Sequence, residues 1–512
     1  MKINLNVTNN ILFWLKHYQE IVPEKTFIFS IDQNINVSYK AAFQTCCRIG
    51  NFLKVRKIKA NDRIALLSNN SIEHLLTYFG VMSYGATICT INVEMNQNNL
   101  NYILNRIAPK LVLYDNITLL PDSLSEYDSL PLGSWTNSIS GSFFEKLDKV
   151  SNNDFGLPVN EPDDTASIFF TSGTDAKPKG VLISFLNLTK NTIAITERFG
   201  INEKDRILEF RSFNWMSAQV LSGLGSLCNG STLFFALKFS VTKYFTWIRA
   251  FKATIATGNP TSINMLINRP LSLKRNEISH LRFFTSSSSP LFIKDWKKFE
   301  TLYDIPILQG YGASECGWIA GSNENNRRLG SVGVPLQYQN VKIVDRSGKR
   351  LPANVQGMVV IRSNISNIQN RYLGDDVEIK TDSEGRIVTG DIGFIDEEGF
   401  LFITGREKDL IIIGGINISP IEIENVLMEL TEIAAAAVFG ISERIFGEKI
   451  VAFVVPDHNV DLDMEKIYDH CQRRLTKIKV PKKIDIINSL PKTERGKLDK
   501  KIMNKIWLDM NG

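Results

Sequence analysis

Short apolar segments that alternate with helical patterns are the feature that most constrains the fold of this chain. Between residues 63 and 114, three strand-like segments are separated by two stretches with the spacing of amphipathic helices. A second alternating half runs from Arg206 to about residue 325. Alternation at this interval favours parallel sheets covered by helices. The sequence therefore predicts an α/β fold with two sheet subdomains.

The pattern of expected strands and helices changes after these two α/β halves. From Gly330 to Phe402, short strands lie between turn pairs, which indicates a small β-rich subdomain. From Leu410 onward, strands and helices mix again over about a hundred residues. Because 512 residues exceed what one core normally holds, we expect several domains. We place a large N-terminal domain at residues 1–408 and a small α+β domain at 409–512.

Composition excludes several classes of protein. The net charge of +5 is small for this length and gives no reason to expect a nucleic acid or an anionic membrane as partner. Six scattered cysteines fit a reducing compartment, since they form neither a disulfide framework nor a C-x-x-C site. No window approaches the roughly 20 apolar residues of a membrane span, and the N-terminus lacks a signal-peptide pattern. We expect a cytoplasmic protein.

Residues 169–181 carry the first chemical signal. The apolar run from Ala166 to Phe170 ends in a small, hydroxyl-rich loop that also holds Lys177 and Lys179. Main-chain N–H groups, hydroxyls and ammonium groups in such a loop can surround phosphate oxygens. The spacing is not that of a Walker A loop, and a surface turn of the same composition would be common. The loop by itself suggests phosphate and does not prove it.

Two further stretches suggest contacts with a planar ligand and a sugar. In Gln309–Glu315, glycines flank Tyr311 and a carboxylate follows, which suits close backbone approach and a hard Mg²⁺ ligand. In Thr389-Gly-Asp391, a tight turn presents an aspartate that can accept two hydroxyl protons. Each pattern taken alone is an ordinary turn.

The last two stretches are charged. Gly405–Asp409 lies directly before an apolar run and Gly414-Gly415, where either a solvated connector or a hinge would fit. Leu490–Lys497 is a turn near the C-terminus with Lys497 at its tip, and basic tails of this kind are usually solubilising.

The order and spacing of all five stretches resemble the adenylate-forming superfamily, which contains acyl-CoA synthetases, aryl-acid ligases, luciferases and adenylation domains. The resemblance runs from roughly residue 20 to the end of the chain. It implies an AMP-forming carboxylic acid–thiol ligase that uses ATP, Mg²⁺ and coenzyme A or a carrier-protein phosphopantetheine. It also implies that the small C-terminal domain is mobile about a hinge at Asp409.

The resemblance assigns roles to residues at matching positions. Those implied to hold the β- and γ-phosphates of ATP are Thr171, Ser172, Gly173, Thr174 and Lys179. Asp175 and Ala176 depart from the family pattern, which usually has a small hydroxyl residue and a glycine there. A carboxylate facing a triphosphate would repel it unless Asp175 turns outward or reaches Mg²⁺.

The remaining assignments concern the nucleotide and the reaction. The resemblance implies that Tyr311 packs on adenine, Ser314 contacts phosphate and Glu315 binds Mg²⁺. It further implies that Asp391 binds the ribose and Arg406 helps to hold the nucleotide. Lys497 matches the catalytic lysine that bridges the substrate carboxylate and the α-phosphate. No protein base is required, because the carboxylic acid is already ionised.

The second half-reaction implied by the family is attack of a thiol on the acyl-adenylate. The C-terminal domain would rotate, withdrawing Lys497 and admitting the thiol. Gly414 and Gly415 resemble the segment that lines the pantetheine tunnel.

The acid pocket is the least determined part of the sequence. Phe213, Asn214 and Trp215 match a pocket segment, and Ser287 and Ser288 lie in a loop expected near adenine and the acyl group. A neutral Asn214 disfavours an α-amino acid, since relatives that activate amino acids have an aspartate there to hold the ammonium group. A hydroxybenzoate-like acid stays open, and Phe213 and Trp215 fit a core role equally well.

Three functional readings remain at this point. The first is a carboxylic acid–CoA ligase acting on a small-molecule acid. The second is a free-standing adenylation enzyme that loads a carrier protein. The third is a catalytically silent nucleotide-binding member, which Asp175 and Ala176 favour and Lys497 and Glu315 oppose.

Overall fold

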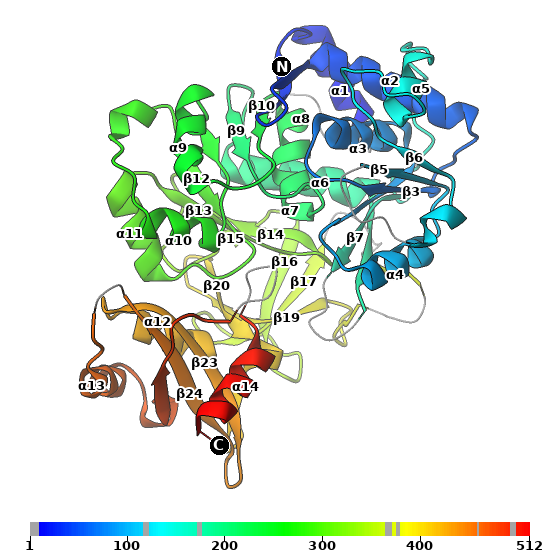
Figure 1. Ribbon diagram of the computed structural model, residues 1–512. Helices are drawn as coiled ribbons and strands as arrows, with labels where there is room; N and C mark the ends of the chain where they lie inside the picture. Colours follow the sequence, from blue (N-terminus) through cyan, green and yellow to red (C-terminus); the bar gives the residue numbers. More distant parts are fainter. Residues whose placement is uncertain are drawn as a thin grey trace.

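The computed structural model describes residues 10–115, 122–171, 177–363, 371–374, 379–457, 460–491 and 498–511. Two α/β lobes lie side by side, a β-rich subdomain lies beneath them, and a smaller lobe holds the C-terminus (Figure 1). Among the described residues, no helix has the length and apolar content needed to cross a membrane. This arrangement confirms the predicted α/β class with a β-rich subdomain and a small C-terminal domain.

The first lobe contains a seven-stranded sheet in the order β18-β8-β7-β4-β3-β5-β6. Its strands are β3(Arg63–Leu67), β4(Thr87–Ile91), β5(Leu111–Tyr114), β6(Ser129–Pro131), β7(Thr165–Thr171), β8(Lys179–Ser184) and β18(Arg371–Tyr372). Strands β3 to β7 run parallel, whereas β8 and β18 are antiparallel additions at one edge. The carboxyl ends of the parallel strands therefore open on the same side.

The second lobe contains a nine-stranded sheet in the order β15-β14-β13-β12-β11-β9-β10-β1-β2. Its strands are β1(Thr26–Ser30), β2(Ile35–Ser38), β9(Arg206–Glu209), β10(Thr232–Phe235), β11(Ile255–Ala256), β12(Phe283–Ser286), β13(Ile307–Ala313), β14(Gly317–Gly321) and β15(Val334–Pro335). Its central strands are again parallel, from β10 through β9, β11 and β12 to β13.

Helices cover both sheets. They are α1(Leu12–Ile21), α2(Tyr39–Val55), α3(Ile72–Tyr84), α4(Gln97–Ile107), α5(Phe143–Asp148), α6(Phe185–Phe199), α7(Met216–Ala218), α8(Gly225–Asn229), α9(Val241–Ala250), α10(Pro260–Asn268) and α11(Ile293–Tyr303), with a π-helical segment η2(Gln219–Leu224) between α7 and α8. Local sequence sets their ends. The hydroxyl of Ser71 accepts from the backbone of His74 at the start of α3, and Gly85 ends this helix in the left-handed region. All thirteen residues of α3 are buried between the lobes' core elements.

The remaining strands form two smaller sheets. The β-rich subdomain contains β16(Gln339–Val344), β17(Gly357–Ser363), β19(Ile387–Ile395) and β20(Leu401–Arg406) in antiparallel pairs. The C-terminal lobe contains β21(Ile411–Ile413), β22(Ile416–Ile418), β23(Ile433–Glu443), β24(Gly447–Pro456) and β25(Lys483–Ile486), with helices α12(Pro420–Met428), α13(Met464–Arg474) and α14(Lys500–Asn511). The single turn η4(Glu407–Asp409) joins the two sheets. The expected domain boundary at about residue 409 falls at this turn and stays a prediction.

Candidate active site

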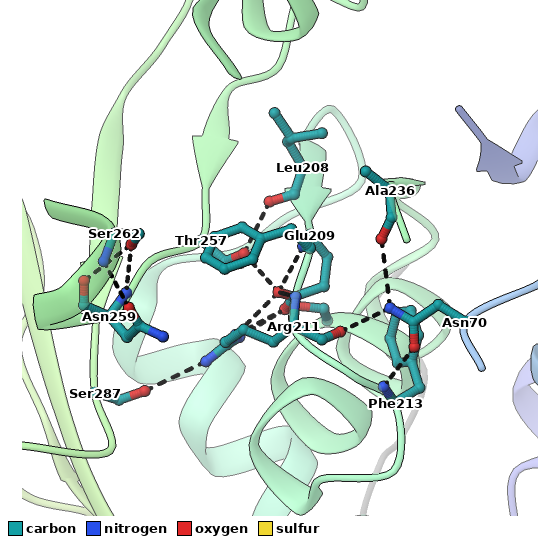
Figure 2. A network of polar contacts seen from close by, with 12 residues as sticks. Asn70, Leu208, Glu209, Arg211, Phe213, Ala236, Thr257, Asn259, Ser262 and Ser287 are labelled. Carbon is teal, nitrogen blue, oxygen red and sulfur yellow. Dashed lines mark hydrogen bonds and ion pairs between the residues drawn. The ribbon is translucent and has the colours of Figure 1, made fainter. Parts of the chain in front are cut away.

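The two large sheets meet at the carboxyl ends of their parallel strands. Asn70, three residues beyond β3, donates from Nδ2 to the Arg211 carbonyl at 3.0 Å and accepts from the Phe213 amide at 2.8 Å. Asn214 donates from Nδ2 to the Ser68 carbonyl at 3.0 Å. Segment 211–214, which follows β9, is therefore tied to the end of β3 (Figure 2). Ligands of open α/β sheets bind at such carboxyl edges.

Tyr311, Asp391 and Arg406 form one hydrogen-bonded group, although three different strands carry them. The Tyr311 hydroxyl donates to Asp391 Oδ2 at 2.5 Å, and Arg406 Nε donates to Asp391 Oδ1 at 2.7 Å. Burial, followed by the charge of Asp391, raises the pKa of Tyr311 well above its ordinary value, so this hydroxyl stays protonated. The pairing of β19 with β20 places Asp391 directly opposite Arg406. Three residues assigned to the nucleotide thus lie together.

Glu315 lies in the turn between β13 and β14 and contacts a residue that no sequence pattern singled out. The Tyr372 hydroxyl donates to Glu315 Oε1 at 2.7 Å, and the Lys179 ammonium lies 5.3 Å from the centre of the Tyr372 ring. Strand β18, which carries Tyr372, pairs with β8, the strand that begins at Lys179. The expected Mg²⁺ ligand and the expected phosphate lysine therefore share Tyr372 as a neighbour. Ser314, in the same turn, is half-buried.

Two cavities adjoin these groups. The larger has a volume of about 30 Å³ and has Glu315, Met216 and Val220 in its wall. The smaller has a volume of about 10 Å³ and has Asn214, Trp215 and Phe170 in its wall. The Oδ1 atom of Asn214 is buried and has no hydrogen-bond partner in the part of the chain that the structure describes. An unpaired buried acceptor beside a cavity is a position for a ligand donor.

Phe213 and the serine loop differ in their surroundings. Phe213 is fully buried, packs edge-on against Phe235 and lines neither of the two cavities. Ser287 is buried and accepts a hydrogen bond from Arg211 Nη1 at 3.3 Å. Ser288 is exposed and has a φ of +77°. Of the expected pocket residues, Asn214 and Trp215 line the smaller cavity, Ser287 contacts Arg211, and Phe213 is part of a buried apolar cluster.

Several expected residues lie outside the described part of the chain. They are Ser172, Gly173, Thr174, the departures Asp175 and Ala176, and Lys497. Thr171 ends β7 and pairs with Lys179 across the β7–β8 hairpin. The hairpin thus brings the two ends of the expected phosphate loop together.

The expected hinge residue and the glycine pair make their contacts with the C-terminal lobe. Asp409 Oδ1 lies 3.0 Å from the Lys500 ammonium. Gly414 and Gly415 form the exposed turn between β21 and β22, with φ values of +56° and +83°. The Gly414 amide donates to the Phe446 carbonyl at 2.8 Å, which is a contact within the same lobe. In this arrangement the glycine pair makes no hydrogen bond among the described residues to the Tyr311–Asp391–Arg406 group.

Family models match both parts of the chain. The model described as AMP-binding enzyme matches residues 15–373, and the model described as AMP-binding enzyme C-terminal domain matches residues 422–497. The chain belongs to the AMP-binding enzyme family. The resemblance drawn from the five sequence stretches is therefore confirmed, as is the ligase class that it implied.

Named relatives agree with this family. An oxalate–CoA ligase of Arabidopsis thaliana is 30% identical over 465 residues, which cover 88% of this chain and 90% of the relative. The crystal structure of ATP-bound MatB from Rhodopseudomonas palustris superimposes with a TM-score of 0.88 at 25% identity, covering 99% of this chain and all of that one. MenE from Bacillus subtilis, solved with ATP and a magnesium ion, has the same fold, with a TM-score of 0.79, 24% identity and coverage of 95% and 98%.

A buried carboxyl group on α12 gives a testable pH dependence in this AMP-binding enzyme. Burial raises the pKa of Glu424, on α12, to about 7. The folded protein then holds a proton that the unfolded chain releases above about pH 4.5, so stability falls as the pH rises from about 4.5 to 7. We expect Glu424→Gln to raise the free energy of unfolding at pH 8 by on the order of 2–3 kcal/mol. The amide oxygen of glutamine can still accept from the Val438 amide.

Urea unfolding of the Glu424→Gln variant and the parent chain at pH 5 and pH 8 measures this effect. The difference between the two proteins should be large at pH 8 and small at pH 5. A difference that is equal at both pH values would show that Glu424 is ionised in the folded protein throughout this range. Glu422→Gln, on the same helix but paired with Lys479 and more exposed, is the matched control.

Proposed function

We propose that the chain is an acyl-CoA synthetase that activates a carboxylic acid with ATP and transfers the acyl group to coenzyme A. The hydrogen-bonded group of Tyr311, Asp391 and Arg406 is the observation that carries the proposal. These residues come from separate stretches, each ordinary alone, and their convergence supports a nucleotide site. The match to AMP-binding enzymes and the CoA ligases among the relatives support the same reaction.

The residues of the group suit the parts of ATP assigned to them. Asp391 offers two carboxylate oxygens to the ribose hydroxyls, and Arg406 holds this carboxylate in place. Glu315 suits Mg²⁺, because a nucleotide-borne Mg²⁺ needs only one or two protein carboxylates in addition to phosphate oxygens. The described residues contain no cluster of three or more acidic, histidine or cysteine ligands, which is consistent with that sharing. When bound, Mg²⁺ supplies positive charge to the phosphates.

Lys179 and Lys497 complete the proposed electrostatics. Lys179 begins the strand beside Tyr372 and Glu315, where the β- and γ-phosphates are expected. Lys497 is proposed to approach the substrate carboxylate and the α-phosphate, where negative charge gathers in the transition state. Fixed positive groups at such a position lower the barrier without a proton transfer.

The residues expected around the acyl group favour a substrate whose acyl group is uncharged and can form hydrogen bonds. Asn214 Oδ1, in the wall of the smaller cavity, is buried without a partner among the described residues. Buried polar atoms are normally paired, so this acceptor suits a hydrogen-bond donor of a substrate. We propose a small carboxylic acid that bears a hydroxyl or similar group; the neutral Asn214 disfavours an ordinary α-amino acid.

Transfer of the acyl group to the thiol is proposed to require movement of the C-terminal lobe. We propose rotation about Asp409, which would break its ion pair with Lys500 and carry Gly414 and Gly415 to the thiol. A location in the cytoplasm is part of the proposal, supported by six free cysteines.

A panel of carboxylic acids tests the proposal. Purified enzyme, ATP, Mg²⁺ and coenzyme A should release pyrophosphate and form AMP and an acyl thioester with at least one acid. Panel members should differ in pairs by one hydroxyl group, because the pocket predicts that the hydroxylated member has the lower KM. Efficient adenylation without a thioester on coenzyme A would contradict the proposed acceptor and favour a carrier-protein phosphopantetheine. The absence of pyrophosphate release with every acid would contradict the reaction itself.

A further inference from the structure

Glu209 and Arg211 form a buried ion pair that the proposed reaction does not use. Their side chains are 0% and 6% exposed, and Arg211 Nη2 lies 2.6 Å from Glu209 Oε2. Glu209 also accepts from the amides of Phe210 and Arg211 at 2.9 and 2.8 Å. Burial opposes its ionisation, but Arg211 and the hydroxyls of Ser222 and Thr257 keep the pKa of Glu209 below its ordinary value. Glu209 is therefore an ionised carboxylate beside the Arg211 guanidinium.

The pair connects several elements at one edge of the second sheet (Figure 2). Glu209 is the last residue of β9 and accepts from Ser222 of η2 at 2.6 Å. It also accepts from Thr257, which follows β11, at 2.7 Å. Arg211 Nη1 donates to Ser287, which follows β12, at 3.3 Å. The network therefore fixes the carboxyl ends of three neighbouring strands, where ligands of such sheets bind.

A second ion pair lies at the amino ends of the strands of the same sheet and serves as a comparison. Asp205, just before β9, lies 2.8 Å from Arg282, just before β12, and is also nearly fully buried. Buried ion pairs contribute little net stability relative to apolar residues of the same volume. Stability alone therefore does not explain the pair of Glu209 and Arg211. Unlike the pair of Asp205 and Arg282, it extends to Ser287 and to the segment that carries Asn214.

We propose that Arg211, held by Glu209, is a positioning residue that sets the geometry of the carboxylic-acid pocket. One edge of its guanidinium is held by Glu209, and the remaining nitrogen, Nη1, holds Ser287. Its carbonyl is fixed by Asn70, so segment 211–214 and Asn214 keep their place beside the smaller cavity. The inference rests on the proposed acid-activating function. It also implies that Arg211 is neutralised by Glu209 and does not serve as a partner for a second substrate carboxylate.

Arg211→Lys tests the proposal in the full-length enzyme. Lysine keeps the charge but lacks the planar fork that reaches Glu209 and Ser287 at once. With the acid that gives most pyrophosphate in the panel, we expect the KM for the acid to rise about 10-fold. We expect the KM for ATP to change by less than about 2-fold, because Tyr311, Asp391 and Arg406 lie on other elements. A general loss of structure would move both constants together.

Arg282→Lys is the matched control, since it makes the same change in the ion pair at the amino ends of the strands. It should lower the melting temperature without changing the KM for the acid. Equal effects of Arg211→Lys and Arg282→Lys on that KM would overturn the proposal.

Ser287→Ala keeps the proposal falsifiable if Arg211→Lys does not fold. It leaves the ion pair intact and removes only the hydroxyl that Arg211 holds. We expect the KM for the acid to rise about 3- to 10-fold in Ser287→Ala. Where Arg211→Lys does fold, we expect the double variant to be no worse than Arg211→Lys. An unchanged KM in Ser287→Ala, or fully additive effects in the double variant, would overturn the inference while the parent enzyme stays active. A parent enzyme that activates no acid would instead remove the proposed function, and this inference with it.

Discussion

Lys497→Ala is expected to lower the rate of acid adenylation about 100- to 1000-fold, which is the usual effect of removing one fixed electrostatic donor from a transition state. The substrate carboxylate attacks the α-phosphorus, so negative charge gathers between two anions where the Lys497 ammonium is proposed to lie. Acid-dependent pyrophosphate release measures this step directly. The KM for ATP should change much less, because Lys497 is not expected to hold the nucleotide before the reaction.

A second assay measures the thioester-forming half-reaction separately from adenylation. Supplied with a preformed acyl-adenylate and coenzyme A, the Lys497→Ala variant should form the thioester at nearly the parental rate. Lys505→Ala, which removes an exposed charge from the same end of the chain, is the matched control and should adenylate normally. Normal adenylation by Lys497→Ala would remove this residue from the mechanism. Equal loss of both half-reactions would instead indicate a damaged C-terminal domain.

Asp391→Asn should weaken ATP binding about 10- to 100-fold, the range expected for lost hydrogen bonds to a charged group. In the parent protein both carboxylate oxygens are used, one by Tyr311 and one by Arg406. Asparagine offers one acceptor oxygen, so its amino group must face either the Tyr311 hydroxyl or the Arg406 guanidinium. The ribose hydroxyls would then face two alternative orientations of the asparagine amide in place of one fixed carboxylate. Calorimetric titration with ATP in the absence of acid measures this binding without turnover.

Asp396→Asn provides the control for this second variant. Asp396 lies at the other end of the same hairpin and pairs with Arg328, away from Tyr311. It should bind ATP as the parent chain does. If both variants bind ATP equally well, Asp391 does not contact the nucleotide, and the proposed site for the ribose is wrong.

Local sequence determined the elements of this protein. The alternation of apolar segments and amphipathic stretches predicted β3, β4 and β5 with their helices, because burial on a sheet or along a helix face requires those periods. Short-range chemistry set helix ends, as at Ser184, whose hydroxyl accepts from the Asn187 amide, and at Gly200, which adopts a left-handed turn. The five ordered stretches also indicated the family and the positions of its nucleotide residues.

Tertiary structure decided which of these positions meet. Tyr311 and Asp391 are 80 residues apart, and Tyr372 and Glu315 are 57 apart. Their contacts depend on strand order, such as β18 lying beside β8, and local periodicity does not encode that order. Phe213 shows the same limit, because its aromatic character fits both a pocket and a core until its neighbours are known.

The ion pair of Glu209 and Arg211 was determined partly by local sequence and partly by tertiary structure. Two charges in the apolar stretch from Ile207 to Phe213 were a visible signal that a buried partner must exist, since an isolated buried charge is strongly destabilised. The sequence could not show that Arg211 also reaches Ser287, 76 residues away. That contact exists because β11 lies between β9 and β12, so that the three strand ends open on one edge. The sequence thus determined the chemistry available to this protein, and the packing of its sheets decided where that chemistry is brought together.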